Sequence, residues 1–223
     1  MIIAIHQPNY LPYLGFFDKM LKADHFVILD DAQFSKGDFQ NRNRINTAAG
    51  PKWLTIPVKG KFMPIKDVVI NEGHLFSGMK WSEYHLKAIK YNYLKTNFFE
   101  ILFYRLEDIY KQEYEKLLEV NLALIFLLKE LFKIKTPVTL SSELGIKSSA
   151  TQRLIDICNY FSAETYLSGK AGPNYMELSL FEKNKINVLI QDFNHPVYKQ
   201  GFNHFEKNLS SIDAFFNAGN ILE

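Results

Sequence analysis

The chain has 223 residues, of which 47% are hydrophobic, 15% aromatic and 22% charged. This apolar content is ample for a folded core and excludes an intrinsically disordered chain. A formal net charge of +2 does not indicate a dedicated nucleic-acid-binding protein. The single cysteine, Cys158, excludes a disulfide framework and a cysteine-based zinc site. Because Cys158 lies in the apolar phase of a helical pattern, we expect a buried thiol.

The sequence contains no segment typical of a membrane span or of a secretion signal. The apolar start of the chain, Met1 to Ile5, is much shorter than the core of a signal peptide. The most apolar stretch, Val120 to Leu128, falls well below the roughly 20 residues that a spanning helix needs. Together with a free thiol, these features predict a cytoplasmic protein.

The first thirty residues follow a strand, turn, helix and strand pattern. Ile2 to Ile5 is typical of a buried strand, and Pro8 and Pro12 prevent regular structure in the turn that follows. Apolar residues at helical spacing then lead to a second buried strand at Phe26 to Leu29. Buried β-branched and aromatic runs joined in this way favour a parallel sheet.

The rest of the chain continues the alternation of strands and helices. The polar stretch from Gln33 to Asn46 has no clean period and is predicted to be a loop. Further strands are expected at 53–58, 68–70, 165–168 and 186–190, and helices at 151–161 and 211–216. Residues from about 77 to 134 have apolar spacings of three and four throughout. We therefore predict one α/β domain over residues 1–223, with a parallel Rossmann-like sheet and a helical insertion at about 77–134.

Three polar clusters fall where predicted strands end. They are His6-Gln7-Asn9-Tyr10, Asp30-Asp31-Gln33 and Ser168-Gly169-Lys170-Gly172. In parallel α/β folds, ligands bind at the carboxyl ends of the strands. We therefore expect a single cleft at this edge, with His6, Asn9, Asp30 and Ser168 around it.

The first two clusters each allow a functional and a structural role. His6 suits acid–base chemistry or the orientation of a phosphate, and the alternative is an imidazole that caps the turn. Asp30 and Asp31 suit a magnesium ion, and the alternative is a pair of carboxylates that cap a helix or a turn.

The polar stretch carries a basic cluster, formed by Lys36, Arg42 and Arg44 with Asn41 and Asn43 between them. Such side chains suit an anionic ligand such as phosphate, and the alternative is a solvated charged loop. If the loop binds an anion, we expect Arg42 to point inward and to pair with Asp30 or Asp31 in the absence of ligand.

The loop from Ser168 to Asn174 contains two glycines and a lysine, which suit either an anion-binding nest of backbone N–H groups or a tight turn. His195 follows a predicted strand and is a second candidate for the acid–base group. The other histidines lack the spacing of metal ligands, so we expect them at the surface or in packing. They are His25, His74, His85 and His204.

Three stretches resemble the WbqC-like family of bacterial proteins. They are His6 to Lys19 (HQPNYLPYLGFFDK), Leu29 to Phe34 (LDDAQF) and Phe39 to Ile45 (FQNRNRI). Later stretches at 53–58, 166–169, 193–198 and 209–213 also fit, so the resemblance covers nearly the whole chain. The chain departs from the family at Gly37-Asp38, where the family often has a basic residue beside the lysine.

The resemblance implies a function in bacterial surface-polysaccharide (O-antigen) biosynthesis. It implies a transferase that moves a glycyl or related aminoacyl group, or another acyl group, from an activated donor to a nucleotide-linked amino sugar. A more remote architectural resemblance to pantothenate synthetase, a nucleotidylyltransferase-superfamily enzyme, implies ATP and magnesium as cofactors. The His-x-Gly-His motif of that superfamily is replaced here by Tyr13-Leu14-Gly15-Phe16.

In this interpretation His6 or His195 is the base, and Asp30 or Asp31 holds the metal or orients the sugar. Asp30 is counted with the catalytic residues and Asp31 is the candidate metal ligand. The expected substrate-binding residues are Gln7, Asn9, Tyr10, Gln33, Lys36, Asn41, Arg42, Asn43, Ser168, Gly169, Lys170, Gly172 and Tyr175. The alternative function is a non-catalytic nucleotide-sugar-binding partner of a polysaccharide assembly complex. Neither function requires a nucleic-acid partner, and both are compatible with a homo-oligomer.

Overall fold

The computed structural model describes residues 1–202 and 205–222, so that His204 lies outside the described residues. The chain packs as two units. The first unit contains residues 1–7, 15–31 and 134–194, and the second contains residues 8–14, 32–133 and 195–223.

The first unit contains an all-parallel sheet of five strands in the order β7-β2-β1-β8-β9. The strands are β1 (Ile2–His6), β2 (His25–Ile28), β7 (Val138–Leu140), β8 (Thr165–Ser168) and β9 (Asn187–Ile190). This sheet confirms the prediction of an α/β fold of the Rossmann-like class. It also contains the strands predicted at 2–5, 26–29, 165–168 and 186–190.

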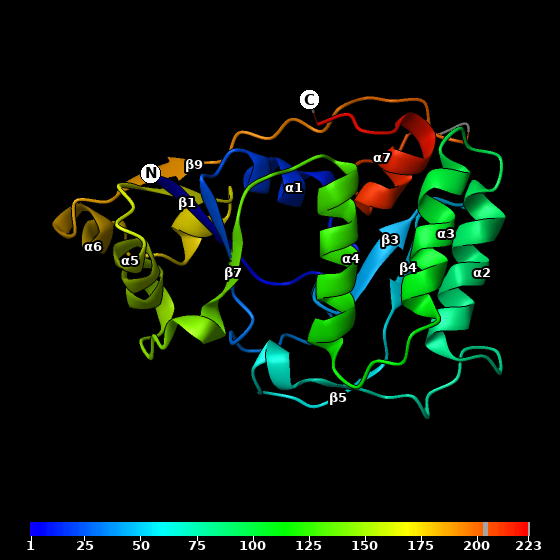
Figure 1. Cartoon of the computed structure of the whole chain (residues 1–223), viewed down its shortest axis with the longest axis horizontal. Helices are drawn as coiled ribbons and strands as arrows, with labels where there is room; N and C mark the ends of the chain where they lie inside the picture. The colour runs from blue at the N-terminus through cyan, green and yellow to red at the C-terminus, as the bar shows by residue number, and fades with distance from the viewer. Residues whose placement is uncertain (203–204, 223) are drawn as a thin grey trace. The chain divides into compact units, whose positions relative to one another are not determined.

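Helices cover both faces of this sheet (Figure 1). Helix α1 (Leu14–Leu21) places Phe16 against His6 and Phe26, with ring centroids 4.9 and 5.2 Å apart. On the other face, Ile3 and Ile5 pack in one apolar core with residues of α5 (Ala150–Tyr160) and α6 (Leu178–Lys183). The core includes Cys158, which is buried as predicted.

The order of the strands reverses at one place in the sheet. From β1 in the centre, the chain builds outward through β2 to β7, and it then crosses to the other side of β1 to form β8 and β9. The reversal therefore lies between β1 and β8. Two short 3₁₀ helices follow strands of the sheet, η2 (Ser141–Leu144) after β7 and η3 (Gly172–Asn174) after β8.

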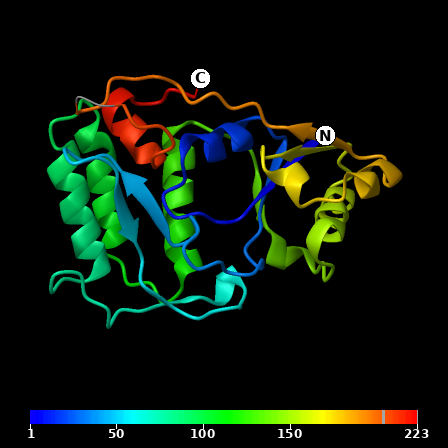
Figure 2. The same cartoon turned by 180° about the vertical axis from the view of Figure 1, so that it is seen from behind.

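The second unit combines four helices and two antiparallel hairpins among its described residues. The helices are α2 (Trp81–Tyr93), α3 (Phe99–Tyr110), α4 (Leu117–Leu131) and α7 (Ser211–Ala218). The hairpins are formed by β3 (Arg42–Ile45) with β4 (Lys52–Thr55) and by β5 (Val58–Lys59) with β6 (Val69–Ile70), and η1 (Ile65–Asp67) lies between the last two. Helices α2, α3 and α4 occupy the segment predicted to be helical, and Figure 2 shows the first hairpin beside them.

The prediction of a loop over residues 33–46 is wrong at its end, because Arg42–Ile45 forms β3. Its residues alternate between partly exposed arginines and buried Asn43 and Ile45. The alternation of polar and apolar residues that is typical of a strand is not visible in the sequence, because the inward position 43 holds a polar residue. Asn43 tolerates burial because its Nδ2 donates to the carbonyl of Leu11 at 2.7 Å and its Oδ1 accepts from the backbone N–H of Arg44 at 2.8 Å.

Residues 8–14 are held in the second unit by buried hydrogen bonds. Asn121 of α4 donates to the carbonyls of Pro8 and Gln40 at 2.9 and 2.8 Å. The backbone N–H of Tyr10 donates to the carbonyl of Phe39 at 3.0 Å. These contacts satisfy the backbone of a segment whose two prolines exclude a regular ladder.

None of the helices in the described part of the chain is both long enough and apolar enough to cross a membrane.

Gly172 packs against Ser168, and this contact gives a test of the first unit. A Cβ at Gly172 would overlap Ser168 Oγ and approach Met176 Cε to 2.9 Å, whereas a Cβ at Gly169 would enter open space. We expect Gly172→Ala to lower the free energy of unfolding by about 1–3 kcal/mol through overpacking, measured by urea denaturation. Gly169→Ala is the matched control and should stay within about 0.5 kcal/mol of the wild type. Equal stability of the two variants would contradict this packing.

Candidate functional site

Polar side chains follow every strand of the parallel sheet at its carboxyl edge. They are His6, Asp30, Ser141, Ser168 and Gln191, from β1, β2, β7, β8 and β9 in turn. Ligands of open α/β sheets bind at this edge, at the point where the strand order reverses. The reversal lies between β1 and β8, so the end of β1 is the first place to look for chemistry.

A buried lysine lies where β1 and β8 separate. The ladder between these strands ends at the pair Ala4–Leu167, so Ile5 has no partner residue in β8. Its carbonyl instead accepts a hydrogen bond from Lys19 Nζ of α1 at 2.9 Å. Lys19 is only 3% exposed, and burial lowers its pKa to about 7. The amine therefore gives up its proton close to neutral pH.

His6 is a neutral imidazole beside this lysine. Its Nδ1 lies 2.9 Å from the carbonyl oxygen of Gln7, and because a carbonyl only accepts, Nδ1 carries the hydrogen. The Nε2 atom therefore has the lone pair and can accept a proton. Burial, together with the charge of Lys19, lowers the pKa of His6 to about 4. Near neutral pH the two side chains together carry at most one positive charge.

Ser168 points to the opposite face of the sheet from His6. Tyr166 pairs with Ile3, so Tyr166 and Ser168 share the face that α5 and α6 cover, and Ser168 contacts Gly172 there. His6 lies on the face of α1, where it contacts Phe16. The expectation that His6 and Ser168 border one cleft is therefore wrong, because one residue of register sends successive strand side chains to opposite faces.

The two aspartates after β2 are engaged by η2 and α5. Asp30 accepts from the backbone N–H and Oγ of Ser142 at 2.9 and 2.6 Å. Asp31 forms an ion pair with Arg153. Ser141 Oγ lies 3.0 Å from Asp30 and 2.5 Å from Asp31, and its single hydrogen is donated to one carboxylate at a time. These contacts support the capping alternative for Asp30. No cluster of three or more potential metal ligands exists among residues 1–202 and 205–222.

The glycine-containing loop after β8 forms a tight turn. The backbone N–H of Gly172 donates to the carbonyl of Gly169 at 2.9 Å. Lys170 is exposed, with its Nζ 3.7 Å from Asp192, and Tyr175 is 70% exposed. The turn alternative thus accounts for Gly172, where a Cβ would overlap Ser168, while Lys170 and Tyr175 remain accessible to a ligand.

The other predicted site residues belong to the second unit, and half of them are buried there. They are Asn9, Tyr10, Gln33, Lys36, Asn41, Arg42, Asn43 and His195. The hydroxyl of Tyr10 is buried and hydrogen bonds to His85 Nδ1 at 2.8 Å and to the Tyr110 hydroxyl. Asn9, Asn41 and Asn43 are also buried, whereas Gln33 and Lys36 are exposed. His195 Nδ1 lies 2.9 Å from the carbonyl of Pro196, and burial lowers the pKa of His195.

Arg42 is partly buried as expected, but its partners differ from the expected ones. Its guanidinium lies over the ring of Trp53, with the central carbon 4.3 Å from the ring centroid, and donates to the carbonyl of Gly37. The expected pairing with Asp30 or Asp31 is wrong, since those carboxylates hold Ser141, Ser142 and Arg153.

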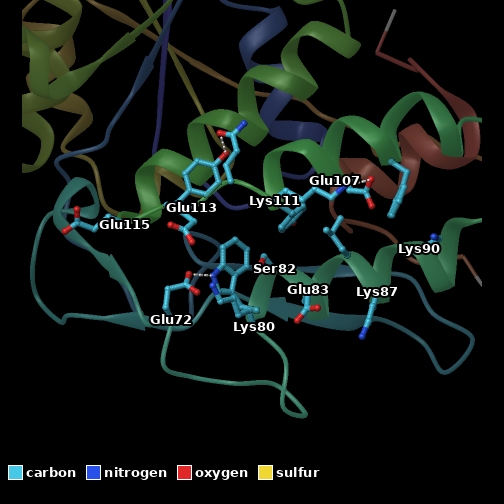
Figure 3. A pocket seen from close by; sticks show the side chains of 16 residues that line it. Glu72, Lys80, Ser82, Glu83, Lys87, Lys90, Glu107, Lys111, Glu113 and Glu115 are labelled. Atoms are coloured by element: carbon cyan, nitrogen blue, oxygen red, sulfur yellow. Dashed lines mark hydrogen bonds and ion pairs between the residues drawn. The ribbon is translucent and has the colours of Figure 1, made fainter.

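A cavity of about 810 Å³ lies in the second unit between α2, α3 and residues 111–115 (Figure 3). Its wall contains Trp81, whose Nε1 donates to Glu72 at 2.8 Å, and an ion pair between Lys111 and Glu107 at 3.0 Å. Four lysines and five glutamates line it, so its charge selects neither an anion nor a cation. We therefore assign no ligand to this cavity.

Lys19 was not among the residues predicted for the site, although the sequence contains a signal for it. It follows Phe16 by three residues and so lies on the apolar face of the predicted helix, where a charged residue needs an explanation. Trp53 was not predicted either, because it is distant in sequence from the arginines that it contacts.

Similarity to known proteins extends over nearly the whole chain. A family model described as the WbqC-like protein family matches residues 7–221. An uncharacterized protein of Mycobacterium tuberculosis (strain ATCC 25618 / H37Rv), Rv1507c, is 33% identical over 222 residues, which cover 97% of this chain and 94% of that protein. No solved structure matches the chain.

The lowered pKa of Lys19 predicts a pH dependence of stability. The unfolded chain binds a proton at this lysine up to pH 10.5, whereas the folded chain releases it near pH 7. Between these values the unfolded state binds more protons, so stability rises with pH. We expect the free energy of unfolding of the wild type to rise by about 2 kcal/mol relative to Lys19→Met between pH 7 and 9.

The measurement is urea denaturation across this pH range. Lys22→Met changes an exposed lysine of the same helix and should keep the pH dependence of the wild type. Parallel pH curves for the wild type and Lys19→Met would show that the buried amine keeps its proton.

Proposed function

Since the chain belongs to the WbqC-like protein family, we propose that it is an acyltransferase of bacterial surface-polysaccharide biosynthesis. It forms an amide on a nucleotide-linked amino sugar, with a glycyl or related aminoacyl group as the group transferred. The observation that carries this proposal is the neutral His6 at the carboxyl end of β1, whose Nε2 can accept a proton.

Amide formation needs a base at this position. The amine nitrogen of the sugar attacks the acyl carbon of the donor, a carbon–nitrogen bond forms, and the bond from that carbon to the leaving group breaks. The nitrogen must lose one proton during this exchange. His6 Nε2 takes the proton and returns it to the leaving group, so His6 ends the cycle neutral.

Lys19 is a positioning residue in this scheme. It is too deeply buried to contact a substrate, and it acts through its charge on His6 and through its hydrogen bond to Ile5. When Lys19 is neutral it no longer repels a proton on His6, which makes the imidazole a stronger base. Burial is the largest cause of the lowered pKa of His6, and the protonation state of Lys19 near pH 7 adjusts the basicity of His6 further.

The magnesium implied by the remote resemblance to pantothenate synthetase does not fit the two aspartates. Their oxygens already accept hydrogen bonds from Ser141, Ser142 and Arg153. The proposed transfer of the acyl group therefore involves neither a metal ion nor ATP. The donor is a carboxylate activated elsewhere or in this protein, and the turnover experiment includes both kinds.

The alternative function is a non-catalytic nucleotide-sugar-binding partner of a polysaccharide assembly complex. The observation that favours it is the pKa of about 4 for His6, which is below the value near the working pH that suits a general base best. A binding protein would need His6 only for packing against Phe16. Turnover separates these two functions.

The test combines turnover and binding in the same variants. Purified protein is incubated with UDP- or dTDP-linked amino sugars and with glycine plus ATP, or with acyl-CoA, and amide products are detected by mass spectrometry. We expect His6→Gln and His6→Ala to lower turnover by about 10²–10⁴-fold with little change in the affinity for the nucleotide sugar.

The control is His74→Ala, which changes an exposed histidine and should keep wild-type turnover. Thermal unfolding of each variant establishes that it is folded. Unchanged turnover in both His6 variants would remove the proposed base. Nucleotide-sugar binding by the wild type without an amide product from any donor would favour the binding protein.

A further inference from the structure

Two arginines lie against one tryptophan on the outer face of the first hairpin of the second unit. Arg44 is directly opposite Trp53 in the ladder between β3 and β4, and Arg42 lies two residues before it on the same face. The central carbons of their guanidinium groups are 4.3 Å (Arg42) and 5.6 Å (Arg44) from the indole centroid. Both charges therefore lie within the range of a cation–π contact with a single ring.

These arginines have few hydrogen-bond acceptors of their own. The Nε atoms of both are buried and have no partner. Arg42 donates from one Nη atom to the carbonyl of Gly37, and within the described ranges neither arginine forms an ion pair with a carboxylate. A buried N–H donor without an acceptor costs free energy and calls for an explanation, and the exposed parts of the same guanidinium groups remain open to an anion.

The turn before β3 fixes the plane of one guanidinium. Gly37 has a φ of +92°, a left-handed conformation that favours glycine, and this turn presents its carbonyl to Arg42. With Trp53 on its face and Gly37 at one Nη, Arg42 is held in place before any ligand arrives. Planar guanidinium groups held in this way suit the paired oxygens of a phosphate or diphosphate.

The same surface carries exposed aromatic area. Trp53 and Phe39 are each 40% exposed, and their ring centroids lie 5.9 Å apart at an interplanar angle of 43°. Aromatic side chains next to arginines form stacking surfaces for nucleobases, which every base can use because each has a flat face. An isolated inorganic anion would not use this aromatic area, whereas a nucleobase would stack on it.

We propose that Arg42, Arg44 and Trp53 bind a nucleoside diphosphate. The oxygens of the diphosphate accept hydrogen bonds from the two guanidinium groups, and the base stacks on the exposed rings of Trp53 and Phe39. This inference rests on the proposed function in one respect, because the acceptor proposed there carries a nucleoside diphosphate. It concerns binding alone and is tested without turnover.

The experiment is isothermal titration calorimetry of the full chain with three probes: UDP, pyrophosphate and uridine. The wild type should bind UDP at least about tenfold more tightly than pyrophosphate, because only UDP adds a stacked base. Arg44→Ala should weaken UDP binding by about tenfold or more, and Arg44→Lys should weaken it nearly as much because the lysine keeps the charge but loses the fork. Trp53→Ala should reduce the affinity for UDP to that for pyrophosphate.

The matched control is Arg105→Ala, which removes an arginine of the same unit that is paired with Glu130. It should leave the affinity for UDP unchanged. Thermal unfolding establishes that each variant is folded, and if Trp53→Ala does not fold, Arg44→Lys with UDP decides alone. The proposal is overturned by equal UDP affinity in the wild type and both Arg44 variants, or by equal affinity of the wild type for UDP and pyrophosphate. It is also overturned if the protein binds single-stranded poly(U) RNA and not UDP.

The experiments distinguish a failure of the proposed UDP-binding surface from a failure of the proposed acyltransferase activity. Wild-type UDP affinity in the Arg44 variants would overturn only the binding surface, and amide formation by these variants would still support the acyltransferase. Loss of UDP affinity in Arg44→Ala, without an amide product from the wild type, would support the binding surface and overturn the acyltransferase.

Discussion

The hydrogen bond from Lys19 to the carbonyl of Ile5 is the contact on which the candidate site of the first unit depends. Where the strand order of a parallel sheet reverses, the connections after the two neighbouring strands lead away from each other, and a backbone group beyond the last ladder pair needs another partner. Here the carbonyl of Ile5 is that group, and a side chain from α1 satisfies it. Because the donor is a buried amine, desolvation lowers the pKa of Lys19 to about 7, and the charge of Lys19 adds to the effect of burial in lowering the pKa of His6. A structural requirement of the fold therefore creates the electrostatics at the end of β1.

The elements of the fold that could be predicted are those whose side chains are uniformly apolar. β1 and β2 are continuous buried runs, and the apolar spacing of α5 places Cys158 in the core, so their sequences contain the whole signal. β3 could not be predicted, because its inward position at Asn43 is polar and is satisfied by the carbonyl of Leu11, 32 residues earlier in the chain. β7 has three residues, none fully buried, so its sequence carries almost no pattern.

The positions of the candidate site residues could be predicted better than the directions of their side chains. That His6, Asp30 and Ser168 end strands follows from the sequence, because turn residues punctuate apolar runs. His6 and Ser168 point in opposite directions because Ile3 pairs with Tyr166. The register between two strands so distant along the chain cannot be predicted from the sequence of either strand. The partners of Asp31 were hidden for the same reason, since Arg153 lies 122 residues away.

A lysine and an arginine that lack a carboxylate partner behave in opposite ways. The chemistry of the two units differs for this reason. A buried lysine can release its proton, so Lys19 becomes neutral near pH 7, and its amine can then accept a proton again. A guanidinium does not deprotonate in proteins, and Trp53 lies beside two of them, those of Arg42 and Arg44. Trp53 lowers the cost of these charges without cancelling them, because the ring is polarised and not ionised. The first unit therefore has groups that exchange protons, whereas the hairpin of the second has groups that can only be neutralised by an anion.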